Sequence, residues 1–255
     1  MTKALKTTAI VTSTEQIGHD IISMWLRLPE IAKNARSGQF LSVYCKDKSK
    51  LLPRPISICE IKPETGEIRL IYRIVGEGTR ELAKLHTNET IDVLGPLGNG
   101  FHLEGKKAIL IGGGIGIPPM LELAKQLNCE KQIVLGYRDE VFLNKEFLPY
   151  GTVTVATEDG SVGIKGNVID AIRAAAINGD IIYACGPTPM LRSVKAYAKE
   201  MNITAQLSME ERMACGVGAC LACVCKSKEM DHHSNVNNKR ICKDGPVFYA
   251  EEVEL

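Results

Sequence analysis

Residues 109–119 read Ile-Leu-Ile-Gly-Gly-Gly-Ile-Gly-Ile-Pro-Pro, a short apolar run followed by closely spaced glycines and two prolines. This order indicates a buried strand, a glycine turn and the start of a helix. Glycine lets the backbone approach a phosphate, and the free amides of a helix start bind the same group. Ile117 stands where the G-x-G-x-x-G fingerprint has its third glycine, so the stretch does not match that motif, although it can bind phosphate through the same kind of backbone contact. We expect the turn to bind the phosphates of a dinucleotide through Gly112, Gly113, Gly114, Gly116 and Pro118.

The sequence around this turn alternates between two kinds of segment. We expect buried strands at residues 108–111, 132–136, 152–157, 181–184 and 204–208, and helices at residues 119–127, 167–177 and 187–201. Strands that alternate with helices form a parallel sheet covered by helices on both faces. The second part of the chain is therefore predicted to be an α/β domain.

A second turn of the same kind follows the strand at residues 181–184. Cys185, Gly186 and Pro187 stand between that strand and the next helix, and we expect this turn at the other end of the sheet. A glycine and a proline there would let a flat nicotinamide ring lie near Cys185. The alternative is an ordinary helix start that follows a buried cysteine.

The first part of the chain has a different pattern. Six short runs of β type cover residues 8–12, 21–28, 40–45, 56–61, 67–75 and 90–94, separated by turns rich in Pro, Gly, Asn and charged residues. Such runs with almost no helical periodicity predict a small antiparallel barrel. Residues 76–86 are the one candidate helix, expected to cross an end of the barrel.

Three short motifs in the barrel could together hold a flavin dinucleotide. Arg54 can pair with a pyrophosphate, Pro55 and Ile56 follow it, and Ser57 can present its hydroxyl to the edge of a flavin ring. On the next strand, Tyr72 can pack against the ring and Arg73 can face phosphate. Gly78 and Thr79 lie at the start of the candidate helix, where free amides bind phosphate. The alternative is a plain barrel whose Arg and Tyr residues contact solvent.

Five of the nine cysteines crowd into residues 215–242. Cys215, Cys220 and Cys223 have the spacing C-x4-C-x2-C, and Cys242 follows after eighteen residues, which is the plant-ferredoxin spacing of a [2Fe–2S] site with a longer final gap. A four-cysteine zinc site is the alternative, but zinc ribbons favour paired C-x2-C motifs and only one is present. Cys225 could replace a ligand, and we interpret it as a buried thiol. The adjacent pair His232 and His233 is interpreted as solvated.

Overall composition limits the range of partners. The 31 basic residues are balanced by 30 acidic ones, so no strong field attracts nucleic acid or a charged membrane surface. No apolar stretch has the length of a signal peptide or a membrane span. We therefore expect a cytoplasmic protein with no nucleic acid and no membrane among its partners.

Taken in chain order, the motif at residues 54–57, the glycine–proline turn and the motif at residues 185–187 resemble the ferredoxin-reductase superfamily over residues 1 to about 205. The stretches at residues 208–223 and 244–248 resemble, more specifically, the electron-transfer subunits of class 1B dihydroorotate dehydrogenases. The resemblance implies an FAD-binding barrel at residues 1–101, an NAD-binding domain at 102–207 and a [2Fe–2S] domain at 208–255. It implies FAD contacts at Arg54, Pro55, Ile56, Ser57, Ile71, Tyr72, Arg73, Gly78 and Thr79, and iron ligands at Cys215, Cys220, Cys223 and Cys242.

The same resemblance implies a function. In that family dihydroorotate is oxidised at an FMN in a separate catalytic subunit, and electrons pass through [2Fe–2S] and FAD to NAD+ during de novo pyrimidine (UMP) biosynthesis. The expectation is one FAD and one cluster per chain, NAD+/NADH as substrate, no general acid or base, and a heterotetramer of two of each subunit. Two alternatives stay open: a ferredoxin:NAD(P) or sulfur-metabolism reductase subunit of the same architecture, and a redox-sensing module that does not turn over.

Overall fold

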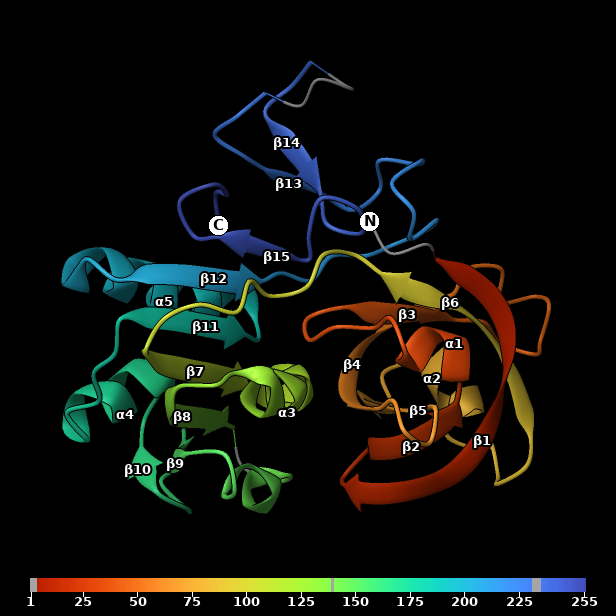
Figure 1. Ribbon diagram of the computed structural model, residues 1–255, viewed down its shortest axis with the longest axis horizontal. Coiled ribbons are helices and arrows are strands. Elements are labelled where there is room, and N and C mark those ends of the chain that lie inside the picture. The colour runs from red at the N-terminus through yellow and green to blue at the C-terminus, as the bar shows by residue number, and fades with distance from the viewer. Residues whose placement is uncertain (1–3, 139, 231–234) are drawn as a thin grey trace.

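The computed structural model describes residues 4–138, 140–230 and 235–255. Figure 1 shows a barrel, coloured red to yellow, beside an α/β sheet, coloured green to teal. The blue C-terminal segment, residues 209–255, lies over the junction between them and is called the tail below.

The barrel has six antiparallel strands and is closed. Its strand order is β1-β2-β5-β4-β3-β6. The strands are β1 (Leu5–Gly18), β2 (Ile21–Arg27), β3 (Phe40–Val43), β4 (Arg54–Lys62), β5 (Glu67–Arg73) and β6 (Thr90–Leu97). In β1, Ala9 and Val11 are buried while Ile10 between them is exposed, as expected for a strand with one face on a core. The predicted barrel is confirmed.

Two short helices belong to the barrel: α1 (Pro29–Ala32) and α2 (Glu77–Leu82). Ile31 of α1 and Leu82 of α2 are buried in the same core cluster as the inward side chains of the strands. Helix α2 lies within the predicted segment 76–86 but is shorter. Helix α1 was not predicted, because four residues are too few to show a helical period.

The second domain contains a seven-stranded sheet of order β10-β9-β8-β7-β11-β12-β15. All neighbouring strands are parallel except β15, which is antiparallel to β12. The strands are β7 (Lys107–Gly113), β8 (Glu130–Tyr137), β9 (Thr152–Thr157), β10 (Ile164–Lys165), β11 (Ile181–Cys185), β12 (Thr204–Ser208) and β15 (Val247–Tyr249).

Helices cover both faces of this sheet, as predicted. They are α3 (Ile117–Gln126), α4 (Val168–Ala174) and α5 (Thr188–Met201), with short 3-10 turns η1 (Gly114–Gly116) and η2 (Asn144–Phe147). Leu110 of β7 belongs to the same buried cluster as Met120 of α3. The next residue, Ile111, belongs to the opposite cluster with Leu191 of α5. The side chains of β7 therefore alternate between two apolar layers.

One expectation about the sheet is wrong. The turn at residues 185–187 does not lie at the other end of the sheet from the glycine turn, because β11 pairs directly with β7 and Cys185 is the register partner of Gly112. The chain runs outward from β7 to β8, β9 and β10, and then returns through α4 to the opposite side of β7. This reversal is a topological switch point, and it brings the two turns together.

The tail has little secondary structure of its own. Strands β13 (Val224–Lys226) and β14 (Asn238–Arg240) form a two-stranded ribbon, and β15 extends the main sheet. Its apolar residues Ile241 and Phe248 share a buried cluster with Phe40 and Leu97 of the barrel. The tail therefore depends on the barrel for part of its core.

Polar side chains join the barrel to the α/β domain. Glu122 of α3 is buried, and its carboxylate accepts the backbone N–H of Ile61 in β4 at 2.7 Å. Lys125 pairs with Glu60 at 3.0 Å. Arg69 of β5 is 8% exposed and pairs with Glu146 of η2 at 2.6 Å. Buried polar groups with satisfied partners fix the relative position of the two domains.

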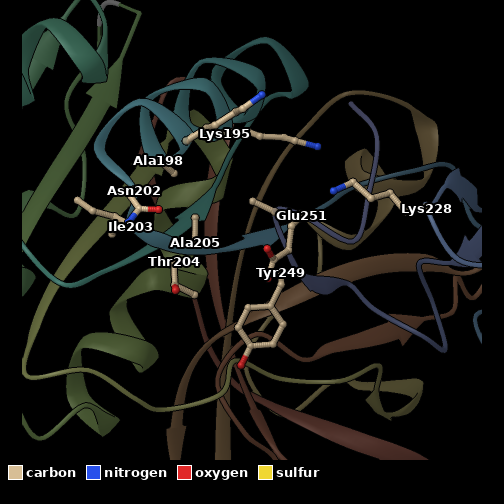
Figure 2. A pocket seen from close by; sticks show the side chains of 11 residues that line it. Lys195, Ala198, Asn202, Ile203, Thr204, Ala205, Lys228, Tyr249 and Glu251 are labelled. Carbon is tan, nitrogen blue, oxygen red and sulfur yellow. The ribbon is translucent and has the colours of Figure 1, made fainter.

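A cavity of about 480 Å³ separates α5 from the tail (Figure 2). Lys195 enters it from α5 and Lys228 from the tail. The Lys195 ammonium donates to the carbonyl of Val253, and Lys199 lies in the last turn of α5, where a cation stabilises the helix dipole. The cavity lies at the start of β12, whereas the two turns lie at the carboxyl ends of β7 and β11.

Among the described residues, none of the helices combines the length and apolar character that crossing a bilayer requires.

Glu122 gives a pH-dependent contribution to stability. Burial raises its pKa, against the opposing effects of the Ile61 N–H, Lys125 and Gln126; Glu60 nearby also raises it. When the pKa of a carboxyl is higher in the folded state than in the unfolded state, its protonated form favours folding. This contribution to the free energy of unfolding is complete below the ordinary Glu pKa of about 4.3 and is lost as the pH rises through the raised value. The stability of the protein relative to Glu122→Gln should therefore fall between about pH 4 and neutrality. Urea unfolding midpoints over that range measure it. Glu15→Gln, on the exposed side of β1, is the control, and identical pH profiles for both variants would refute the assignment.

Candidate functional site

The glycine turn after β7 packs tightly against the turn after β11. A Cβ at Gly116 would lie 2.4 Å from the carbonyl oxygen of Cys185, and one at Gly113 would lie 2.4 Å from Sδ of Met190. Gly114 differs, because its φ is +52° and nothing lies within 4 Å of its Cβ position. Gly116 is thus required by packing against backbone, a side chain at Gly113 would displace Met190, and Gly114 has open space beside it that a ligand could approach.

Cys185, Gly186 and Pro187 complete the same edge of the sheet. Cys185 is buried, and its burial raises the pKa of the thiol to about 12, although contact with Ser208 opposes the shift. A Cβ at Gly186 would lie 2.5 Å from Cε of Met190 and 3.2 Å from Cα of Gly113. Pro187 is the N-cap of α5. The structure therefore brings the two predicted nucleotide motifs to one edge of the sheet, where the buried thiol of Cys185 is neutral.

Arg54 and Gly78 are far apart in the sequence and meet at one end of the barrel. A Cβ at Gly78 would lie 1.9 Å from Nε of Arg54, so the guanidinium rests directly on the glycine backbone. Thr79 Oγ1 accepts the N–H groups of Val75 and Gly76 at 3.0 and 3.2 Å, which fixes the loop before α2. Only glycine at residue 78 leaves the arginine in this place.

The other predicted flavin contacts fall on both faces of the barrel wall. Ile56 and Tyr72 point into the barrel core, whereas Ile71 belongs to the cluster shared with α3 and Cys185. Tyr72 is 4% exposed, burial raises its pKa, and its hydroxyl has no hydrogen-bond partner among the residues that the structure describes. An orphaned buried hydroxyl suits a site that a polar cofactor completes.

Arg73, Pro55 and Ser57 lie nearer the surface. The Arg73 guanidinium donates to the carbonyl of His19 at 3.4 Å, at the turn between β1 and β2. Pro55 and Ser57 alternate with Ile56 along β4 and so face outward. Arg73 ends β5, and Pro55 and Ser57 lie on β4, the strand that pairs with β5.

The four predicted iron ligands meet as two pairs of thiols. Cys215 contacts Cys220, and Cys242 contacts Cys223. Backbone amides point at the sulfurs: Gly218 donates to Cys242 Sγ at 3.1 Å, and Ala219 donates to Cys215 Sγ at 3.3 Å. No three His, Cys, Asp or Glu side chains within the described ranges are placed to share one metal ion. Two thiol pairs surrounded by N–H donors fit a two-iron cluster, which needs two thiolates on each iron.

The environments of the two pairs differ. Burial raises the pKa of Cys215, but the Val217 N–H and the contact with Cys220 outweigh it and lower the pKa to about 6. Burial and the neighbouring Cys223 raise the pKa of Cys242 to about 12. Cys220 is exposed and Cys215 is half-buried, whereas Cys223 and Cys242 are both buried, so the first pair lies nearer the surface than the second.

Cys225 does not join these pairs. It lies on β13, donates from its thiol to the carbonyl of Lys239 on β14 at 3.5 Å, and has its pKa raised to about 11 by burial. The interpretation of Cys225 as a buried thiol agrees with this contact. His232 and His233 lie outside the residues that the structure describes.

The cysteine loop is docked on the barrel strand that pairs with the flavin motif. A Cβ at Gly216, whose φ is +70°, would lie 2.8 Å from Oγ of Ser42 in β3. Ser42 is the register partner of Pro55 in β4, so the loop contacts the strand that lies beside the motif at residues 54–57. Sequence reasoning missed Ser42, and no local signal could have found it, because the contact joins residues 174 positions apart.

The comparisons with known proteins agree with this geometry. Residues 8–102 match the model of an oxidoreductase FAD-binding domain, and residues 210–254 match the iron–sulfur cluster binding domain of dihydroorotate dehydrogenase B. Relatives named dihydroorotate dehydrogenase B (NAD(+)), electron transfer subunit, include one from Caldanaerobacter subterraneus subsp. tengcongensis, 40% identical over 97% of this chain and 98% of its own length. Another, from Streptococcus mutans, is 44% identical over 98% of this chain and 99% of its own length.

Solved structures give the same result for the fold. A structure of the NADH-dependent reduced ferredoxin-NADP oxidoreductase, described in a study of flavin-based electron bifurcation, has a TM-score of 0.87 and 31% identity over 96% of this chain and 89% of its own. The ferredoxin reductase of carbazole 1,9a-dioxygenase shares the fold at a TM-score of 0.65 and 21% identity. With the FAD-binding and iron–sulfur domains matched and relatives similar over nearly the whole length, the chain belongs to the family of dihydroorotate dehydrogenase B (NAD(+)) electron transfer subunits.

Proposed function

We propose that the chain carries electrons from the FMN of a dihydroorotate-oxidising partner subunit, through a [2Fe–2S] cluster and FAD, to NAD+ in de novo pyrimidine (UMP) biosynthesis. The observation that carries this proposal is the order of the three sites. The cysteine loop contacts Ser42 on β3, the strand that pairs with Arg54–Ser57 in β4, and the outer side of the barrel wall shares a buried cluster with Cys185 at the nucleotide turns.

The residues of the barrel would bind and orient the flavin. Arg54 would neutralise the pyrophosphate, and Gly78 leaves room for its guanidinium. Pro55, Ile56, Ser57, Ile71, Tyr72, Arg73 and Thr79 would complete the site. FAD supplies the chemistry that links one-electron and two-electron carriers. The chain itself needs no general acid or base for this transfer.

Cys215, Cys220, Cys223 and Cys242 would hold the cluster, with the amides of Gly218 and Ala219 donating to the sulfurs. Cys220 is exposed, and so are the neighbouring apolar side chains of Val217 and Leu221. A cluster with one pair of ligands at the surface and one inside suits transfer from a partner to an internal flavin.

The nicotinamide nucleotide would bind at the switch point between β7 and β11. Gly112, Gly113, Gly114, Gly116 and Pro118 would face the phosphates, and Cys185, Gly186 and Pro187 would face the nicotinamide. The buried thiol of Cys185 has its pKa raised to about 12, so it stays neutral at physiological pH and would contribute packing rather than charge.

The proposal includes the assembly and the domain limits. The partner would be the FMN-containing catalytic subunit, in a heterotetramer of two subunits of each kind. The chain would divide into residues 1–101, 102–207 and 208–255. A cluster with four cysteine ligands and five further cysteines outside any disulfide favour a reducing compartment, the cytoplasm.

One observation favours a second candidate function. The structure at 31% identity is described as an NADH-dependent reduced ferredoxin-NADP oxidoreductase, so a ferredoxin:NAD(P) reductase subunit is an alternative. The identity of the co-purifying partner separates the two. A partner that contains FMN, together with dihydroorotate-dependent NAD+ reduction by the complex, supports the first function. A partner without FMN would exclude it.

Replacing the fourth cysteine tests the cluster. Cys242→Ser should lose most of its iron, because the inner thiol pair is broken. Cys225→Ser should keep a full cluster, because a serine can still donate to the Lys239 carbonyl. Iron and acid-labile sulfide per chain, measured on anaerobically purified protein, give the answer. Iron lost from the Cys225 variant but kept in the Cys242 variant would reverse the ligand assignment.

The contact between Arg54 and Gly78 provides a test of the flavin site. Gly78→Ala places a methyl group where the guanidinium lies, so FAD affinity should fall by about tenfold to a hundredfold, the effect of losing hydrogen bonds from a charged group. Gly76→Ala is the matched control, since nothing lies within 4 Å of its Cβ position. Fluorescence titration of FAD into apoprotein measures both. Equal affinities in the two variants would remove Arg54 from the site.

A further inference from the structure

Arg240 joins two parts of the tail. It ends β14, and only 8% of its surface is exposed. Its Nε and Nη2 donate to the two carboxylate oxygens of Asp244 at 3.0 and 3.2 Å. Its Nη1 donates to the carbonyl oxygen of Gly218 at 3.3 Å. One guanidinium therefore connects the loop that carries Cys215, Cys220 and Cys223 with the turn that carries Cys242.

The turn at residues 240–245 is closed around Cys242. The carbonyl oxygen of Arg240 accepts the backbone N–H groups of Lys243, Asp244 and Gly245 at 3.1, 2.7 and 3.3 Å. The Asp244 carboxylate also accepts the backbone N–H of Arg240 at 2.8 Å. The ion pair thus fixes the shape of the turn, and Cys242 inside it is 2% exposed.

Gly218 is held at both of its polar atoms. Its N–H donates to Cys242 Sγ at 3.1 Å, and its carbonyl accepts from Arg240. Its φ is +83°, and a Cβ there would lie 2.6 Å from Cδ of Lys243. The guanidinium and the sulfur therefore fix the orientation of this glycine from opposite sides.

We propose that Arg240 is a positioning residue that holds the Gly218 N–H against Cys242 Sγ and thereby sets the reduction potential of the cluster. The inference rests on the proposed assignment of Cys242 as an iron ligand. Hydrogen bonds to the sulfurs of a cluster help set its potential, and a donor stabilises the more negative, reduced form. The wild-type potential is accordingly higher than that of a protein in which this bond is loosened.

Arg240→Lys separates position from charge. Lysine carries the same charge but lacks the planar fork that reaches Asp244 and Gly218 together. The matched control is Arg173→Lys, which alters an exposed arginine of α4 paired with Glu200 of α5 at 2.9 Å, outside the turns that hold the cysteines. Both variants are prepared anaerobically as the full chain with its cofactors.

The midpoint potential of the cluster, from titrations followed by EPR, should shift to a more negative value in Arg240→Lys and stay unchanged in Arg173→Lys. The coupling of the exchangeable amide proton in the ENDOR spectrum should weaken only in the first variant. Loss of iron to a chelator should become on the order of tenfold faster there, the effect of one lost hydrogen bond to a charged group.

An Arg240→Lys protein with a full cluster, an unchanged potential and an unchanged proton coupling would overturn this role and leave the ligand assignment intact. Absence of iron and sulfide from the unsubstituted protein would instead overturn the proposed cofactor. If Arg240→Lys retains no cluster, Asp244→Asn keeps the arginine and removes its bidentate acceptor. A weakened amide-proton coupling in that variant supports the proposal, and an unchanged coupling contradicts it.

Discussion

The tail cannot form a hydrophobic core alone, and this constraint determines how the redox sites are arranged. Its apolar residues Ile241 and Phe248 are buried in a cluster to which the barrel contributes Phe40 and Leu97. The same docking brings Gly216 against Ser42 on β3, next to the strand of the flavin motif. Because the tail shares a buried cluster with the barrel, the cysteine loop must lie close to the barrel. Hydrophobic burial thus accounts for the short distance between the cysteine loop and the flavin domain that electron transfer needs.

A second constraint acts at the switch point of the sheet. Because β11 returns to the side of β7, two turns that are distant in the sequence must pack on each other. Gly116 has no room for a Cβ there, and Gly114 has open space beside it. The run of glycines therefore allows both close packing of the two turns and access for a ligand. The sequence motif predicted only the access for a ligand.

Buried charge fixes the barrel against the α/β domain. Arg69 donates to Ser23 within the barrel and pairs with Glu146 across the junction, and Glu122 reaches the backbone of β4. Such groups tolerate few alternative arrangements, since breaking one bond leaves a buried charge without a partner. The segment between β6 and β7 also contributes, because its Asn99 donates to the carbonyls of Gly245 and Asp244 in the tail. These contacts hold the barrel, the α/β domain and the tail against one another.

The sequence by itself determined the features that depend on local pattern. Short runs of β type without helical periodicity predicted the barrel, strand–helix alternation predicted the parallel sheet, and the spacing of Cys215, Cys220 and Cys223 predicted the cluster loop. Tertiary structure alone decided which turns share an edge, that Arg54 rests on Gly78, and that Ser42 and Arg240 contact the cysteine loop. The physical reason is distance along the chain: periodicity and spacing record interactions between near neighbours, whereas these contacts arise from strand order and from burial shared between segments.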